Sequence, residues 1–386
     1  MEPDDMRSRR TSNTLIIGAS ISGLACAAAL QKQGIGYIII EKEGQAAMPW
    51  RNHYERLHLH TNKRRSNLPF KKWGPMIPRY PGRQQVIDYI DEYQKEFKIE
   101  PVFDTEAIAI GKEEGRWMTE TTNGVFESKY LIMATGAYGK PRPVGFKGLE
   151  TFPGKVLHSC EYKTGAAFRG EKVLVVGFGN SACEIAIDLY EQGAAPVMAV
   201  RSAVNVIPRD VLGVPVLELS ILLSHLSPRI ADAISAPLIN WLIGDIRKLG
   251  LRRKSFGSLE QISREGKAPV LDIGTIQHIR DGHIKIYGDI DHIEGDVVYF
   301  NDGRKEVFHA IVACIGYDRN NIGLVEAEGD GLYFCGYRIS PTGQIREIAA
   351  DAQKIARAIA KADRPGPGER GRGQRLVGEA ERAKGR

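Results

Sequence analysis

The sequence has few cysteines and none of the spacings that build a disulfide or metal framework. Its five cysteines stand singly among 386 residues, with no C-x-x-C pair, so neither a disulfide scaffold nor a zinc site is indicated. The G-x-S-x-G and H-E-x-x-H motifs are also missing, which argues against serine hydrolases and zinc proteases. We therefore expect no metal site and a reducing, cytoplasmic location.

Long uncharged apolar runs are missing as well. The most apolar stretch, Val211 to Gly244, is interrupted by Glu218, His225, Arg229 and Asp232 before about 18 uncharged apolar residues accumulate. We expect it to form one or two core helices and not a membrane span. A lid over an apolar substrate cavity and a surface that rests on a membrane are the alternatives.

Outside the C-terminal tail, the sequence has little excess of one charge sign over the other. The formal net charge is +6, and residues 364–386 hold seven Arg or Lys against three Glu, which places +4 of it there. Because the rest of the chain is nearly neutral, it offers no basic surface for binding DNA or RNA, and nucleic-acid binding is excluded. Because Gly, Pro and Arg dominate the tail, 363–386 is predicted to be disordered. The mixed charges of residues 1–12 predict a flexible N-terminus and not a secretory signal.

Two segments about 160 residues apart repeat the order strand, glycine turn, helix, strand. The first runs from Thr14 to Glu41 and the second from Lys172 to Arg201. In both, the strands are continuously apolar, which is typical of a parallel sheet that is buried on both faces and joined by helices. The sequence therefore predicts an α/β fold with two Rossmann-like dinucleotide-binding domains.

The first glycine turn reads Gly18-x-Ser20-x-x-Gly23. A strand-to-helix turn offers free N–H groups and the positive end of a helix dipole to a pyrophosphate. Ser20 departs from the usual second glycine. Glu41, which lies 23 residues after Gly18 at the end of the next strand, supports the interpretation because a carboxylate there accepts hydrogen bonds from a ribose diol.

The second turn reads Gly177-x-Gly179-x-x-Ala182, and Arg201 ends the following strand. A guanidinium at that position can hold a 2′-phosphate bidentately, whereas a carboxylate would repel it. NADPH is therefore predicted here, and FAD, which has no 2′-phosphate, at the first turn. The NADP-binding residues predicted in this unit are Gly177, Gly179, Asn180, Ser181, Ala182, Arg201 and Ser202.

Other segments extend the first unit. A helix is predicted from Gly82 to Phe97, a turn from Gly139 to Pro143, and a terminal helix from Ile345 to Ala360. Two further buried strands are predicted to end at Thr135-Gly136 and at Gly336. We expect these three residues to line the FAD site.

This order of segments predicts that the NADPH domain is inserted into the FAD domain. Residues 13–150 and 318–362 would form the FAD-binding domain. Residues 151–317 would form the NADPH-binding domain, with an apolar helical insertion at 211–250.

Between the two units, Phe152-Pro-Gly-Lys-Val-Leu-His-Ser-Cys-Glu-Tyr-Lys163 resembles the F-x-G-x-x-x-H-x-x-x-Y/F-K signature of class B flavin-containing monooxygenases. Segments 201–209 and 266–275 are similar to the YUCCA branch, whose members make auxin by oxidative decarboxylation of indole-3-pyruvate. Segments 55–60 and 311–317 are similar to it too. The resemblance extends over nearly the whole chain.

The resemblance also implies residue roles. His158 and Tyr162 would lie near NADP, with His158 in a positioning role. Thr61-Asn62 stands where YUCCA proteins usually carry an apolar residue and proline, and it looks like the N- and S-oxygenating members, in which this Asn lies over the flavin. Asn62 is therefore the catalytic candidate, whereas the residues alone indicate an Asn-containing turn. Tyr162-Lys163 differs from the Trp-Pro ending of Baeyer–Villiger enzymes.

The family's cycle, as the resemblance implies it, uses NADPH to reduce FAD and O₂ to form a C4a-hydroperoxyflavin. The predicted reaction is oxygenation of an aryl pyruvate, with Arg64, Arg65 or Arg79 facing the acidic substrate. The alternative is N- or S-oxygenation of a small amine or thioether. A flavin reductase or electron-transfer module and a non-catalytic nucleotide sensor are hypotheses from other classes. The sequence does not indicate an oligomeric state.

Overall fold

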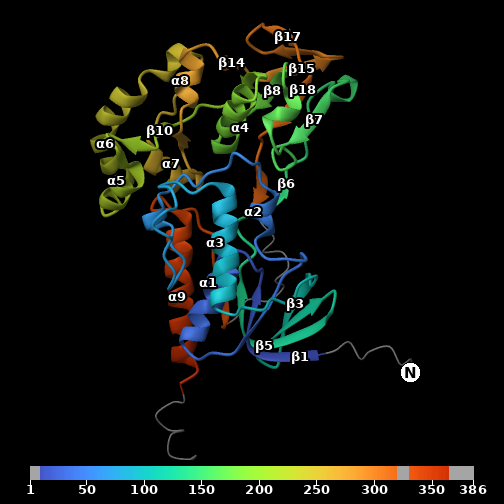
Figure 1. Cartoon of the computed structure of the whole chain (residues 1–386), viewed down its shortest axis with the longest axis vertical. Coiled ribbons are helices and arrows are strands. Elements are labelled where there is room, and N and C mark those ends of the chain that lie inside the picture. Colours follow the sequence, from blue (N-terminus) through green and yellow to red (C-terminus); the bar gives the residue numbers. More distant parts are fainter. Residues whose placement is uncertain (1–8, 320–329, 365–386) are drawn as a thin grey trace, which may run out of the picture.

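The computed structural model describes residues 9–319 and 330–364, and its first sheet combines the N-terminal part of the chain with a strand from near the C-terminus (Figure 1). The strand order is β2-β1-β5-β4-β3, and β20 pairs with β5. The pairs among β1, β2, β5 and β20 are parallel, whereas β3, β4 and β5 pair antiparallel. The strands are β1 (Arg9–Ile17), β2 (Tyr37–Ile40), β3 (Ala107–Glu113), β4 (Arg116–Thr121), β5 (Gly124–Met133) and β20 (Leu332–Phe334).

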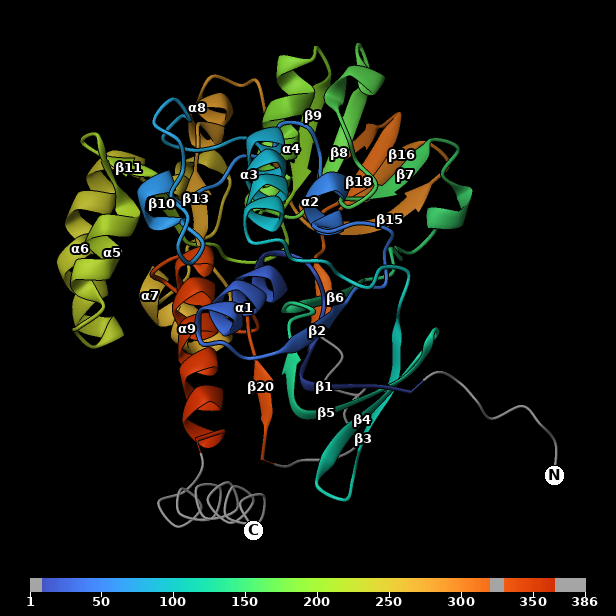
Figure 2. The same ribbon diagram turned by 60° about the horizontal axis from the view of Figure 1, so that its bottom comes forward.

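Three helices belong to this sheet. In α1 (Ile21–Lys32) every residue from Ile21 to Leu30 is buried, because small alanine side chains let neighbouring elements approach closely. The helix α9 (Gln344–Ala362) lies beside α1, as Figure 2 shows, and buries Ile345, Ile348 and Ala352 on one face. With α3 (Arg83–Glu96), these helices agree with the sequence prediction to within two residues at each end.

The second sheet is wholly parallel, with the order β14-β9-β8-β18-β7. Its central strands are buried along nearly their whole length, as their continuous apolar sequences predict. The main helix on it is α4 (Asn180–Glu191). The strands are β7 (Lys155–His158), β8 (Lys172–Val176), β9 (Ala195–Ala199), β14 (Lys285–Tyr287) and β18 (Ala310–Ala313).

In the sequence, the second sheet lies within the segment that separates two strands of the first sheet. All strands of the second sheet come between β5 and β20 in the sequence. The predicted turn at 139–143 is instead part of β6 (Tyr138–Pro141), which pairs antiparallel with β19 (Tyr317–Arg319). Pro141 is tolerated because a two-stranded ribbon has free edges that need no donor. The α/β prediction is confirmed, and the assignment of the two units to FAD and NADPH stays a prediction.

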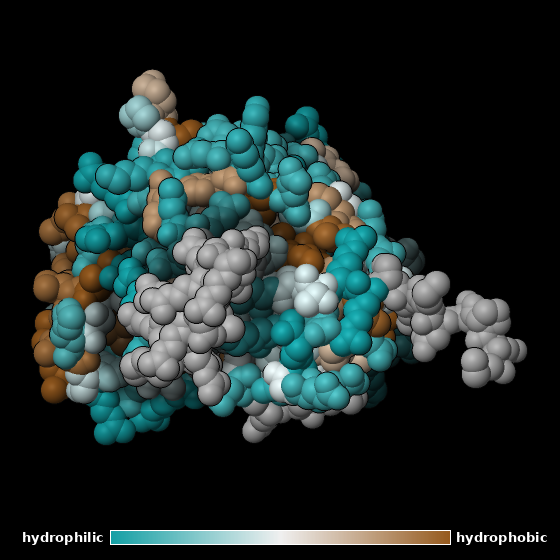
Figure 3. All heavy atoms as spheres, turned by 90° about the horizontal axis from the view of Figure 1, so that it is seen from below, coloured by the Kyte–Doolittle hydropathy of each residue, from teal (hydrophilic) through white to brown (hydrophobic). Residues whose placement is uncertain are grey.

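The apolar segment after β9 differs from the expected core. Its helices are α5 (Val216–Leu223) and α6 (Pro228–Ile243). Leu223, Ala231 and Ile243 are buried, but Leu222, Ile234 and Trp241 are 58% to 71% exposed. Figure 3 shows apolar residues gathered on the side of the molecule where α5 and α6 lie. One face of α6 packs against α7 (Ser258–Glu265) and β10 (Val206–Pro208), and the opposite face is left on the surface.

The two predicted terminal segments are partly ordered. Residues 1–8 and 365–386 lie outside the described residues. Within the expected flexible N-terminus, Arg9 to Ser12 extend β1, and Arg9 pairs with Glu127 of β5. Asp363, the first residue of the expected tail, ends α9 and accepts a hydrogen bond from Asn13 at 2.7 Å. Residues 9–12 and Asp363 thus belong to the folded part of the chain, contrary to the prediction, because side-chain contacts hold them against β5 and Asn13.

Smaller elements complete the described chain. None of its helices is long and apolar enough to cross a membrane. The remaining elements are α2 (Met48–Asn52), α8 (Thr275–Arg280), β11 (Asp210–Val211), β12 (Val214–Pro215), β13 (Val270–Asp272), β15 (Ile290–Glu294), β16 (Val297–Phe300) and β17 (Lys305–Val307), with short 3₁₀ turns at Lys63–Arg65, Leu149–Thr151, Gly165–Phe168 and Ile246–Leu249.

Candidate functional site

The first glycine turn connects β1 to α1. Gly18 has a φ of +104°, and a Cβ there would lie 2.8 Å from the carbonyl oxygen of Ala134. A Cβ on Gly23 would lie 1.8 Å from the carbonyl oxygen of Gly18, so only glycine lets α1 approach the turn this closely. Ser20 is the N-cap of α1, and no side chain caps the helix. The first N–H groups of α1 are thus free of a side-chain acceptor, which suits a phosphate.

Glu41 stands at the end of β2, beside this turn. Its Oε2 accepts a hydrogen bond from the N–H of Ala19 at 2.7 Å, and its Oε1 accepts one from the N–H of Glu43 at 3.2 Å. These two bonds hold the carboxylate in one orientation. Each oxygen keeps a lone pair for a further donor, such as a ribose hydroxyl.

Thr135, Gly136 and Gly336 lie where β5 and β20 end. The hydroxyls of Thr135 and Tyr337 are 2.5 Å apart, which joins the two strand ends. Gly136 and Gly336 have φ values of +84° and +86°. A Cβ on Gly336 would lie 2.2 Å from Oγ of Ser22 on α1, so the structure brings the β20 end to the start of α1, as a shared site requires.

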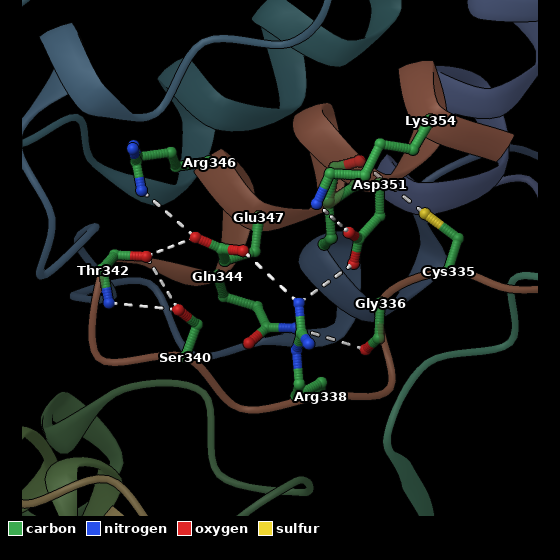
Figure 4. Close-up of polar contacts among 11 residues, drawn as sticks. Cys335, Gly336, Arg338, Ser340, Thr342, Gln344, Arg346, Glu347, Asp351 and Lys354 are labelled. Carbon is green, nitrogen blue, oxygen red and sulfur yellow. Dashed lines mark hydrogen bonds and ion pairs between the residues drawn. The ribbon is translucent and has the colours of Figure 1, made fainter. Parts of the chain in front are cut away.

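A polar network follows Gly336 and leads into α9 (Figure 4). Arg338 lies 3.6 Å from Glu347 and 3.8 Å from Asp351, both on α9. The hydroxyl of Thr342 donates to Glu347, and Gln344 Nε2 donates to the carbonyl of Gly336 at 3.3 Å. These contacts fix the loop between β20 and the N-terminus of α9.

A cavity of about 430 Å³ lies between this loop and the second unit. Tyr138, Tyr337 and Arg338 line one side, and Ile262 and Ser263 of α7 line the other. Aromatic and aliphatic walls with one cation suit a flat, partly apolar ligand.

The second glycine turn connects β8 to α4 with the same backbone. Gly177 has a φ of +116°, and a Cβ there would lie 2.7 Å from the carbonyl oxygen of Cys314. Gly179 is exposed, and a Cβ on it would meet nothing within 4 Å. Ala182 is fully buried, so its methyl group fits where Gly23 allows none. No side chain caps α4, and no acidic residue lies in its first turn.

The polar side chains of this turn face different neighbours. Asn180 accepts a hydrogen bond from the N–H of Leu271 at 2.8 Å and donates to the carbonyl of Pro269 at 3.3 Å. Ser181 lies within hydrogen-bonding reach of the buried Tyr54. Asn180 therefore ties the turn to β13.

Arg201 and Ser202 lie beyond the end of β9, and both are exposed. Glu41 lies 23 residues after Gly18, and Arg201 lies 24 residues after Gly177, so each follows the strand next to its turn, Arg201 one position further along. Among the residues with described positions, no carboxylate pairs with Arg201. The two units thus present opposite charges at equivalent strand ends.

His158 and Tyr162 are buried, with 4% and 1% exposure. The two ring nitrogens of His158 lie 3.1 Å from Sγ of Cys160 and 3.0 Å from the carbonyl oxygen of Gly316. The hydroxyl of Tyr162 donates to Asp188 of α4 at 2.6 Å; burial, and then this carboxylate, raise the pKa of Tyr162. Contact of either side chain with NADP stays a prediction. Because both side chains bond to groups within the protein, they are suited to hold neighbouring segments in position.

Asn62 is buried, at 3% exposure, and its amide is engaged within the protein. Its Oδ1 accepts a hydrogen bond from the N–H of Arg65 at 3.2 Å, which caps the short helix Lys63–Arg65, and its Nδ2 donates to Glu218 of α5 at 3.3 Å. The turn expected from the residues alone is therefore present. The catalytic role stays a prediction.

Three segments far apart in the sequence meet near Asn62. A Cβ on Gly343, the N-cap of α9, would lie 3.5 Å from Thr61 and from Leu217. Glu218 also accepts a bidentate contact from Arg65, at 2.7 Å to 3.1 Å. The first unit's loop, α5 and α9 thus converge, and α5 is a neighbour that no sequence motif indicated.

The cations suggested for an acidic substrate differ in availability. Arg65 is held by Glu218, and Arg79 donates to the carbonyl of Gly213 at 2.8 Å. Arg64 is exposed, and no carboxylate in 9–319 or 330–364 pairs with it. Of the three, Arg64 is the one outside the ion pairs of the described residues, although its charge also helps to lower the pKa of Glu218.

A buried polar pair also joins the two units. His60 contacts Glu184, which lies on α4 and is fully buried. The second carboxylate oxygen of Glu184 has no hydrogen-bond partner. Sequence analysis missed Glu184 because a glutamate inside a helix carries no signal of burial.

The two turns fit a flavin dinucleotide and a pyridine dinucleotide. The glycine cradles, the uncapped helix starts and the open space at Gly179 leave room for pyrophosphates. The described part of the chain contains no group of three His, Cys, Asp or Glu residues that could hold a metal ion.

Comparisons with known proteins agree with this arrangement. Residues 15–211 match the Pyridine nucleotide-disulphide oxidoreductase family. The chain is 38% identical over 316 residues to indole-3-pyruvate monooxygenase YUCCA6 of Arabidopsis thaliana, covering 79% of this chain and 76% of that protein. It is 36% identical over 321 residues to indole-3-pyruvate monooxygenase YUCCA1 of Oryza sativa subsp. japonica, covering 82% and 79%.

Solved structures show the same fold at low sequence identity. An open crystal structure of cyclohexanone monooxygenase matches with a TM-score of 0.74 at 15% identity, covering 92% of this chain and 88% of that one. A flavin-containing monooxygenase from Stenotrophomonas maltophilia matches with a TM-score of 0.66 at 18% identity, covering 92% and 99%. The chain therefore belongs to the YUCCA branch of the flavin-containing monooxygenases, and it is an oxidoreductase that uses a flavin and a pyridine nucleotide.

Proposed function

We propose that this chain is an FAD- and NADPH-dependent monooxygenase that oxidatively decarboxylates an aryl pyruvate such as indole-3-pyruvate. The observation that carries the cofactor assignment is the opposite charge at two equivalent strand ends, Glu41 and Arg201. The substrate class rests on the similarity to the YUCCA relatives, which are indole-3-pyruvate monooxygenases. A cytoplasmic location is part of the proposal.

The first unit would hold FAD. The pyrophosphate would bind at the N-terminus of α1, and Glu41, oriented by the N–H groups of Ala19 and Glu43, would accept the ribose hydroxyls. Thr135, Gly136 and Gly336 would line the rest of the site. When bound, the flavin supplies the redox and oxygen-activating chemistry that the family resemblance implies.

The second unit would hold NADPH. The exposed Gly179 lets the pyrophosphate approach the backbone at the start of α4, and Arg201 would bind the 2′-phosphate. Tyr162 fixes α4 through Asp188, and His158 fixes the strand end near Gly316. These two side chains would act by holding the turn in place.

The loop at 61–65 would form the substrate side. Glu218 and the N–H of Arg65 hold the amide of Asn62 in one orientation, which a residue over the flavin ring needs. Arg64, whose charge is unpaired among the described carboxylates, would attract the carboxylate of the substrate. Closure of α5 over this loop would keep water out.

The test uses the purified holoenzyme with NADPH, O₂ and indole-3-pyruvate. One NADPH and one O₂ should be consumed for each indole-3-acetate and CO₂ formed, with water as the other product. Before substrate is added, NADPH should reduce the flavin without air, and oxygen should then give a persistent absorbance spectrum between the reduced and oxidised forms. Peroxide release without indole-3-acetate would overturn the proposal in favour of an oxidase or reductase.

A second candidate is N- or S-oxygenation of a small amine or thioether. The observation that favours it is Thr61-Asn62, which stands where YUCCA proteins usually carry an apolar residue and proline. Under the first proposal, Arg64→Gln should raise the KM for indole-3-pyruvate about 10-fold and leave any amine turnover unchanged. Turnover of amines or sulfides alone would select the second candidate.

A further inference from the structure

A basic segment from outside the Rossmann repeat lies against the end of β9. The N–H of Val204 donates to the carbonyl of Arg252 at 2.8 Å, and the N–H of Lys254 donates to the carbonyl of Val204 at 3.3 Å. These bonds align residues 252–254 with residues 201–204. The guanidinium of Arg252 then reaches the carbonyl oxygen of Arg201. Two arginines that are 51 positions apart in the sequence are therefore neighbours.

No described carboxylate compensates the charges at this place. Arg201, Ser202 and Arg252 are all exposed. Within 9–319 and 330–364, no carboxylate forms an ion pair with either arginine. Lys254, at the end of this segment, forms an ion pair with Glu265. A guanidinium has five N–H donors, and the contact with Arg201 uses a donor of only one nitrogen of Arg252.

We propose that Arg252 and Arg201 together form the subsite for the 2′-phosphate of NADPH. The inference rests on the proposed function, because that function places the adenosine ribose beside Arg201. A phosphate monoester carries nearly two negative charges near pH 7, so one arginine leaves it half neutralised. Arg252 supplies the second charge and also fixes the backbone from which Arg201 extends. Arg252 therefore selects for a phosphorylated ribose.

The experiment measures binding of 2′,5′-ADP and of 5′-AMP to the FAD-loaded protein by calorimetry. The two ligands differ only in the 2′-phosphate, so they report on the ribose subsite without turnover. Arg252→Gln should weaken 2′,5′-ADP about 10- to 100-fold, the range for a lost charge-assisted hydrogen bond, and change the affinity for 5′-AMP less than about 2-fold. Arg252→Lys should lose less than Arg252→Gln, because it keeps the charge but not the planar fork. Arg201→Gln should have a similar selective effect.

Arg247→Gln is the matched control. Arg247 is an exposed arginine five positions before Arg252, and it is already paired with Asp245. Its replacement should change neither affinity, which separates a local contact from a general loss of positive charge.

The outcomes separate this inference from the proposed function. If the unmodified protein binds both nucleotides equally, the assignment of NADPH to this unit is wrong, and the subsite falls with it. If the unmodified protein prefers 2′,5′-ADP but Arg252→Gln keeps that preference, only the role of Arg252 is overturned. An equal loss of both ligands in Arg252→Gln would identify a purely structural support and would also overturn the subsite. The ratio of KM values for NADPH and NADH should follow the calorimetric ratio.

Discussion

The two glycine turns share a backbone and differ in their side chains. Gly18 and Gly177 have similar positive φ values, and each approaches the chain that follows a neighbouring strand. Each precedes a helix of 12 residues that no side chain caps. The strand ends beside them carry Glu41 in the first unit and Arg201 in the second. The turn geometry is therefore shared by the two units, and the charge at the strand end is the difference on which the predicted choice of nucleotide rests.

The helices that follow the turns are also held differently. The buried part of α1, Ile21 to Leu30, contains small and aliphatic side chains and one serine. In contrast, α4 buries Glu184 and Asp188, which contact His60 and Tyr162. Apolar packing holds α1 to the fold, whereas α4 also depends on buried polar contacts whose partners must be present.

The largest effect is expected where the close packing of α1 is broken. In Gly23→Ala, the new Cβ would lie 1.8 Å from the carbonyl oxygen of Gly18, so α1 must move away from the turn. We expect a loss of about 3 kcal/mol or more in the free energy of unfolding, together with loss of bound flavin. Urea unfolding and the flavin-to-protein absorbance ratio measure both.

The second unit supplies the control for this prediction. Ala182→Gly only removes a methyl group and adds backbone freedom within α4, which costs about 1 kcal/mol. If Gly23→Ala and Ala182→Gly were equally mild, the claim that the first turn is the tighter one would be wrong.

Exchanging the charges should affect the two nucleotides separately. Arg201→Gln should raise the KM for NADPH about 10- to 100-fold, because a charge-assisted contact with a phosphate is lost, and it should leave the KM for NADH nearly unchanged. Glu41→Gln should weaken FAD retention and leave the NADPH preference intact. Steady-state kinetics and flavin release on dilution are the measurements. If either variant changed both the KM for NADPH and the retention of FAD, the idea that each strand-end charge serves one nucleotide would be wrong.

Removing one buried polar contact of α4 should reduce stability but not specificity. In Tyr162→Phe, the buried carboxylate of Asp188 loses its 2.6 Å donor and keeps the N–H of Gly165 at 2.8 Å. We expect the free energy of unfolding to fall by about 1 to 3 kcal/mol, with the NADPH to NADH preference unchanged. A changed preference at normal stability would instead show that Tyr162 contacts the nucleotide.

The smallest effect concerns the contact between the loop of the first unit and α5. The hydrogen bond from Arg65 holds the pKa of Glu218 below its ordinary value of 4.5. Because the folded pKa is the lower one, this contact stabilises the fold above about pH 4.5 and is lost as the pH falls through the folded pKa. The pair is partly exposed, so we expect about 0.5 kcal/mol.

Unfolding free energies between pH 3.5 and pH 7 test this expectation. At low pH the unfolding free energy falls as carboxylates become protonated. Glu218→Gln should remove the part of this fall that comes from Glu218 and leave the part that comes from other carboxylates. Glu294→Gln is the matched control. It should leave the loss of unfolding free energy at low pH nearly unchanged, because the carboxylate of Glu294 is largely exposed and its only described ion-pair contact, with His292, is as long as 3.7 Å. If the unfolding free energy of Glu218→Gln fell more steeply at low pH than that of the unmodified protein, the expected direction of the effect would be wrong.

The sequence predicted the α/β fold, both turns and the family, because these depend on short spacings. Gly18, Gly23 and Glu41 can be recognised in this way, since a strand, a turn and a helix place them by local geometry alone. The apolar segment forms two helices as expected, but it was wrong to expect them wholly in the core, because apolar periodicity does not say which face of α6 finds a partner.

Neighbours from distant segments were decided by the tertiary structure. Arg252 lies beside Arg201, Glu218 beside Asn62, and His60 beside Glu184. Each pair depends on how loops and helices from different parts of the chain meet, and no spacing within one segment encodes this. The sequence by itself thus determined the two glycine turns and the charge at the strand end beside each of them, because both depend on local chain geometry. The tertiary structure alone decided which charges surround each site, because electrostatic contacts depend on distance in space.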